Sequence, residues 1–157
     1  MKQAVMRKLS AIALATSAFA AVPLGYSHWT AAQMDERSKG LPAKMNHAVK
    51  VATESLGAWG NHSMSLVHRE GSGEAELHET QSDILFIRGG DGAVVVGGTI
   101  QNQRRSAPHE LRGTSISGGE KQPLHPGDVL HIPPRTPHQM ILDPGQHLDY
   151  YAVKVDK

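Results

Sequence analysis

Apolar and polar residues alternate in short runs over most of the chain after residue 60, and Gly, Pro and Asp separate these runs. A period of two is typical of strands with one buried face, and the separators are turn-forming residues. Many short strands without intervening helices indicate an antiparallel sandwich or barrel, so the predicted fold class is all-β. The runs predict strands over residues 62–69, 74–79, 84–88, 93–97, 114–117, 120–124, 129–132, 139–142 and 148–155.

Two segments do not follow this alternation. Residues 101–112, QNQRRSAPHELR, show no clear period, and we expect a polar surface loop there. Residues 21–60 are predicted to form an N-terminal helical arm outside the barrel of residues 61–157. Thr30 is suited to cap a short helix that runs through Lys39, with Gly40 as its stop signal. The spacing of Val49, Ala52 and Leu56 predicts a second helix over about residues 43–56.

The first twenty residues have the organisation of a secretory signal peptide. Three basic residues precede the apolar stretch 9–21, and Ala18-Phe19-Ala20 has the small-x-small pattern of a cleavage site. The apolar stretch is too short to span a bilayer, and no later segment is apolar enough to do so. We therefore expect residues 1–20 to be removed and the protein to be exported, periplasmic or secreted, without a membrane anchor.

Composition narrows the classes of partner and cofactor. Without Lys2, Arg7 and Lys8 the formal charge falls from +1 to −2, and no basic stripe remains, which argues against nucleic acid as a partner. The chain has no cysteine, so a metal site is limited to His, carboxylate and water. Such ligands suit one divalent ion such as iron, manganese, copper, nickel or zinc.

Four candidate ligands lie in two separate strand regions. Glu76, His78 and Asp83 belong to the stretch EAELHETQSDILFIRGG, and His138 belongs to PGDVLHIPPRTPHQM. Glu76 and His78 are two residues apart, so their side chains share one face of a strand. His138 shares a face with Met140 and Leu142, which is the expected lining of a mostly apolar cavity. A divalent cation would compensate for burying carboxylates and imidazoles there.

The two regions resemble the paired motifs of the cupin superfamily. In the first motif the spacing Glu76-x-His78-x4-Asp83-x6-Gly90 is kept, but Glu replaces the usual first His and Asp replaces the usual Glu. In the second motif Gly127, Pro133 and His138 match, whereas Arg135 and Leu142 replace the usual Gly and Asn. The resemblance covers about residues 61–155 and implies a double-stranded β-helix, or jelly-roll, cupin barrel.

The resemblance also implies a metal centre of Glu76, His78, Asp83 and His138. Glu76 or Asp83, if not bound to the metal, is the first choice as general base. Paired histidines with one or two carboxylates resemble the facial arrangement of non-haem iron sites. We therefore expect an exported metal-dependent enzyme, an oxidoreductase of the dioxygenase or oxidase type, acting on a small phenolic, a sugar or a glycan end. The alternatives are a non-catalytic module that binds a small molecule or sugar, and a metal-dependent sugar isomerase or epimerase. A homodimer is also expected.

Overall fold

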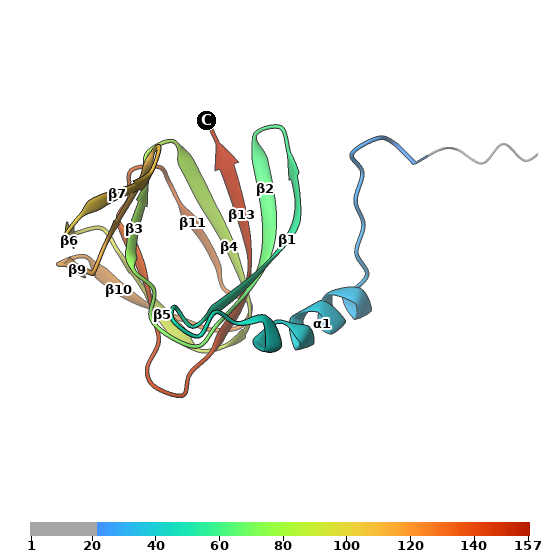
Figure 1. Cartoon of the computed structure of the whole chain (residues 1–157), viewed down its shortest axis with the longest axis horizontal. Helices are drawn as coiled ribbons and strands as arrows, with labels where there is room; N and C mark the ends of the chain where they lie inside the picture. The colour runs from blue at the N-terminus through green and yellow to red at the C-terminus, as the bar shows by residue number, and fades with distance from the viewer. Residues whose placement is uncertain (1–21) are drawn as a thin grey trace, which may run out of the picture.

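The computed structural model describes residues 22–157, so the predicted signal peptide lies outside the described residues. Two antiparallel sheets face each other and form a barrel (Figure 1). The five-stranded sheet has the order β1 (Val51–Trp59), β2 (His62–Arg69), β13 (Leu148–Asp156), β4 (Gln81–Gly90) and β11 (Val129–Ile132). The six-stranded sheet has the order β10 (Glu120–Leu124), β5 (Gly92–Val96), β12 (His138–Ile141), β3 (Ala75–His78), β8 (Glu110–Gly113) and β7 (Arg104–Ala107). A small ribbon pairs β6 (Thr99–Gln101) with β9 (Ser115–Ser117). The predicted all-β class is confirmed.

The main hydrophobic core lies between the two sheets. The inward positions of β2 and β4 contribute Val67 and Leu85, and those of β5 and β12 contribute Val94 and Met140. β13 pairs with both β2 and β4, and its buried Tyr150 belongs to the same core. Because side chains alternate across a strand, this core fixes which residues of each strand point into the barrel.

Gly90, the last residue of the first motif, ends β4 in a conformation that requires glycine. Its φ of +74° lies in the left-handed region, and an added Cβ would collide with the carbonyl of His147. The motif therefore keeps Gly90 so that β4 can turn closely past the start of β13.

The N-terminal helical segment packs on the outside of the barrel. Thr30 caps α1 (Ala31–Gly40), as the sequence predicts, and the structure shows that it does so through a capping box with Gln33. The 3-10 turn η1 (Pro42–Lys44) follows. Met34 and Leu41 pack with Leu66 in a second, smaller core on the outer face of the five-stranded sheet. Within residues 22–157, no helix has the length and apolar character needed to cross a lipid bilayer.

Two predicted elements are wrong. The expected helix over residues 43–56 does not form: residues 47–50 make a turn, and β1 begins at Val51, where its backbone pairs with β2 and extends the five-stranded sheet. The helical part of the arm thus ends at Lys44. The expected loop over residues 101–112 contains the hairpin of β7 and β8, which extends the six-stranded sheet. All residues of β7 are exposed, so no alternation of apolar residues marks it.

Candidate metal centre in the barrel

The strand register brings the two sequence motifs together. His138 on β12 lies directly opposite Glu76 on β3, and His78 follows two residues later on the same face. Asp83 on β4 lies opposite Lys154 on β13, in the facing sheet. The four predicted residues therefore converge in one place, although some fifty residues separate His138 from the others.

The two imidazoles are held so that the same ring nitrogen of each faces the centre. Both side chains are almost fully buried, at 3% exposed each, and their ring centroids are 5.3 Å apart. Nδ1 of His78 lies 2.6 Å from Glu110 Oε1, and Nδ1 of His138 lies 3.0 Å from the carbonyl oxygen of Thr136. Since both partners accept hydrogen bonds, each Nδ1–H is the donor and each Nε2 is directed to the other side. Metal-binding histidines are commonly oriented in this way.

The carboxylates complete a compact donor set. Ligand atoms of Glu76, His78 and His138 all lie within 4.8 Å of one another. Oδ2 of Asp83 lies 3.2 Å from Nε2 of His78 and 3.6 Å from Nε2 of His138. Two imidazoles with one or two carboxylates and no thiolate suit a first-row divalent metal. The residues therefore fit the metal that the sequence predicts, and Asp83 is adjacent as a fourth candidate.

Two cations that the sequence analysis did not identify neutralise these carboxylates. Nζ of Lys154 lies 2.8 Å from Asp83 Oδ1 and 2.9 Å from Nε2 of His78. The guanidinium of Arg112, on β8, lies 3.0 Å from Glu76 Oε2. The centre is thus a mixed cluster of imidazoles, carboxylates and cations.

This cluster shifts the pKa values of its members. Burial would raise the pKa of Asp83, but the hydrogen bond from His78 and the charge of Lys154 outweigh it and lower that pKa to about 2. Burial lowers the pKa of His138, which keeps this imidazole neutral and its lone pair available. Burial also opposes the charged form of His78, but its hydrogen bond to Asp83 prevails and raises the pKa of His78. A metal at His78 must therefore compete with a proton and with Lys154.

A cavity of about 270 Å³ adjoins the cluster inside the barrel. Glu76, Asp83 and His138 line it, together with apolar side chains such as Leu85 and Met140. A second cavity of about 350 Å³ shares Val51, Arg69, Glu76 and Arg112 with the first. A ligand of small-molecule size that enters along these shared residues would reach the donor set.

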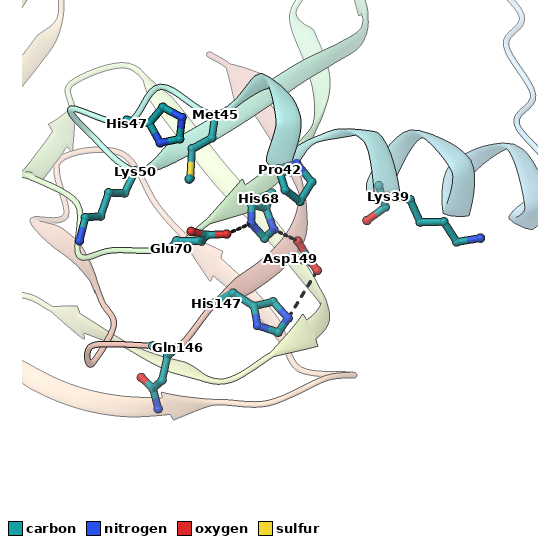
Figure 2. A pocket seen from close by; sticks show the side chains of 12 residues that line it. Lys39, Pro42, Met45, His47, Lys50, His68, Glu70, Gln146, His147 and Asp149 are labelled. Carbon is teal, nitrogen blue, oxygen red and sulfur yellow. Dashed lines mark hydrogen bonds and ion pairs between the residues drawn. The ribbon is translucent and has the colours of Figure 1, made fainter.

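A third, larger cavity of about 700 Å³ lies outside the barrel, between the N-terminal segment and the loop before β13. Figure 2 shows His68 held there between two carboxylates. Its Nδ1 lies 2.7 Å from Asp149 Oδ1, and its Nε2 lies 3.0 Å from Glu70 Oε1. Burial disfavours the charged form, but these hydrogen bonds prevail and raise the pKa of His68. This arrangement ties β2 to β13. Among residues 22–157, the group of side chains whose ligand atoms are placed to hold a metal ion is that of Glu76, His78 and His138 inside the barrel.

Comparison with known proteins supports the fold. The family model of the AraC-like ligand binding domain matches residues 112–157, which include β10 to β13 and His138. A cupin 2 conserved barrel domain protein from Salinispora arenicola superposes with a TM-score of 0.50 at 21% identity, over 73% of this chain and 82% of that chain. The chain therefore has a double-stranded β-helix barrel fold like that of cupin barrel proteins, as the two motifs predict.

Two further solved structures are similar at this level. KdgF from Halomonas sp. gives a TM-score of 0.50 at 16% identity, over 72% of this chain and 86% of that chain. The plu4264 protein from Photorhabdus luminescens gives a TM-score of 0.51 at 15% identity, over 72% and 81% of the two chains. No curated protein sequence matches significantly. At these identities the likeness concerns the fold alone, and the activity must be argued from the site.

Proposed function

We propose that this protein is an exported, metal-dependent cupin enzyme, an oxidoreductase of the dioxygenase or oxidase type that acts on a small molecule held in the barrel. The observation that supports it is the convergence of Glu76, His78 and His138 on one point beside a cavity. Two histidines and one carboxylate on one side of a metal leave positions for a substrate and dioxygen. A small phenolic, a sugar or a glycan end would match the cavity size.

Each residue of the site has a proposed role. Glu76, His78 and His138 would hold the metal, which supplies Lewis acidity and, if it is iron or copper, redox chemistry. Asp83, kept ionised by its low pKa, would accept a hydrogen bond from a substrate hydroxyl and orient it, whereas a pKa of about 2 makes it a weak general base. Lys154, 2.8 Å from Asp83, would stabilise negative charge that develops on the substrate.

The test is oxygen uptake by the purified chain after reconstitution with each candidate metal, across a panel of phenols and sugars. We expect uptake with at least one metal, its loss in His138→Ala, and its retention in His131→Ala, because His131 is an exposed histidine on the neighbouring strand β11. No uptake with any metal would exclude the oxidative reaction.

One observation favours each alternative function. The Asp83–Lys154 pair is an acid and a base beside the metal ligands, as a metal-dependent sugar isomerase or epimerase requires, and turnover without oxygen would identify that activity. The cations already paired with Glu76 and Asp83 favour a non-catalytic binding module, in which those carboxylates do not bind metal. A chain that gains no thermal stability from any divalent ion would support the module.

Export and dimerisation are further parts of the proposal. The basic and apolar pattern of residues 1–20 supports export, and detection of a mature chain that begins near residue 21 would test it. Phe86 and Val129 lie opposite each other on β4 and β11 and are 42% and 61% exposed, which supports a homodimer through this face. A monomer mass in light scattering at micromolar concentration would contradict the dimer.

A further inference from the structure

Arg69, the last residue of β2, is a cation in the barrel without a counter-ion. It lines both the cavity beside the candidate metal centre and the second cavity, which share several lining residues. Among the described residues, no carboxylate oxygen lies within 4.0 Å of its guanidinium nitrogens. Its polar contacts within residues 22–157 are with neutral groups: Nη1 lies 3.5 Å from the carbonyl oxygen of Gly71, and the guanidinium also forms a hydrogen bond with the side chain of Tyr150. Its Nε is buried without a partner.

The other charges at these cavities are already compensated. Lys154 pairs with Asp83 at 2.8 Å, and Arg112 pairs with Glu76 at 3.0 Å. Glu74, which lines the second cavity, accepts from Arg104 at 2.8 Å. Among the charged side chains that line the two cavities, Arg69 is therefore the one without a counter-ion in the described residues.

Arg69 is half-buried with a fully buried Nε, and burying a cation is costly unless an anion or hydrogen-bond acceptors compensate for the lost hydration. The guanidinium group of arginine is planar and stays positively charged. Two of its N–H groups can donate parallel hydrogen bonds to the two oxygens of one carboxylate. Arg112 lines the same two cavities and offers a second guanidinium to the same anion. Val51 and Val67 line the cavity as apolar neighbours, and the low local dielectric that they contribute strengthens such a contact.

From this geometry we infer that the ligand of the barrel is a small organic acid whose carboxylate binds Arg69, with Arg112 beside it, while the rest of the molecule extends toward Glu76 and His138. The inference rests on the proposed function in that it takes the barrel cavity as the substrate site. It also specifies the substrate class, because a neutral phenol or sugar would leave the charge of Arg69 uncompensated.

Matched acids and neutral analogues test this inference by titration calorimetry on the metal-loaded full chain. The probes are D-galacturonate against D-galactose and salicylate against salicylamide. We expect at least one acid to bind about tenfold more tightly than its neutral partner, the range for a charge-assisted contact. In Arg69→Gln this preference should fall to near unity. Arg105→Gln is the matched control, because Arg105 is exposed on β7 and pairs with Glu79, and it should keep the preference.

A carboxylate can also bind a metal directly, so a preference for acids is not enough by itself. The inference requires that this preference decrease when Arg69 is replaced. If Arg69→Gln does not fold, Arg69→Lys is the second variant. It keeps the positive charge but not the paired N–H donors, so it should weaken acid binding several-fold. Equal binding of acids and neutral analogues, a preference unchanged by either Arg69 variant, or no acid binding at millimolar concentration would overturn the inference. Metal content measured on the same samples separates the two proposals. Metal-free protein with an Arg69-dependent preference would refute only the proposed enzyme, and metal-loaded protein without a preference would refute only the acid site.

Discussion

Replacement of Lys154 by methionine should have opposite effects on the stability of the metal-free chain and on its affinity for metal. Methionine approximates the length of the lysine side chain but carries no charge. The change removes a cation 2.8 Å from Asp83 Oδ1 and a hydrogen-bond donor 2.9 Å from Nε2 of His78. Asp83 is left buried with one partner fewer, whereas Nε2 of His78 becomes free for a metal.

The pKa of Asp83 gives the size of the first effect. Burial would raise this pKa, but His78 and Lys154 lower it from 3.8 to about 2. This difference corresponds to roughly 2 kcal/mol, at about 1.4 kcal/mol per pKa unit. Because His78 shares the effect, Lys154→Met should lower the free energy of unfolding of the metal-free chain by about 1–2 kcal/mol, which is roughly 3–8 °C in Tm.

The second effect follows from Coulomb repulsion between Lys154 and the metal. Two unit charges about 4 Å apart interact by roughly 1–4 kcal/mol between bulk water and a protein surface. The variant should therefore bind a divalent metal at least about tenfold more tightly. Calorimetric unfolding in chelator and metal titration of the same samples measure the two effects, with the exposed Lys121→Met as control. Unchanged stability together with weaker metal binding would refute the reasoning.

Three further predictions concern pH and packing. The depressed pKa of Asp83 means that its contribution to stability is present above about pH 4 and is lost as the pH falls through about 2, so denaturation of wild type and Asp83→Asn should converge between pH 6 and pH 2. The raised pKa of His68 means that its contribution is fully present below about pH 6.5 and is lost as the pH rises through the raised value, so the Tm advantage over His68→Gln should be larger at pH 5.5 than at pH 9. Leu66 is 0% exposed beneath α1, so Leu66→Ala should cost about 2–5 kcal/mol in urea denaturation, whereas Val49→Ala, 52% exposed, should stay within about 0.5 kcal/mol.

The strands were predictable where alternation and turn residues agreed. The segments His62–Arg69, Glu120–Leu124 and Val129–Ile132 have the predicted bounds. The error over residues 43–56 arose because Val49, Ala52 and Leu56 have helical spacing, although β-sheet pairing with β2 decides the structure of β1. Local pattern cannot reveal such a long-range partner.

The side chains that converge at the candidate site were predictable from the sequence, but the cations beside them were not. Spacing and strand parity identified Glu76, His78, Asp83 and His138. The alternation of Tyr150, Ala152 and Lys154 with their neighbours carried a signal for Lys154, since an inward Tyr150 also turns Lys154 inward. Arg112 and Glu110 lie in a polar segment without a period, and only the pairing of β8 with β3 brings them to the site. Arg69 shares a strand face with Val67, so it points into the barrel once that face of β2 is known to be the inner one, and the sequence alone does not say which face is inner.

Elemental analysis of the full chain, purified without chelator, tests the central claim most directly. If Glu76, His78 and His138 form a metal centre, wild type and His131→Ala should each retain about one transition-metal ion per chain. His78→Ala and His138→Ala should lose it while keeping their β-sheet circular dichroism. A wild-type chain that carries no metal and takes up none from added iron, manganese, copper, nickel or zinc would contradict the account.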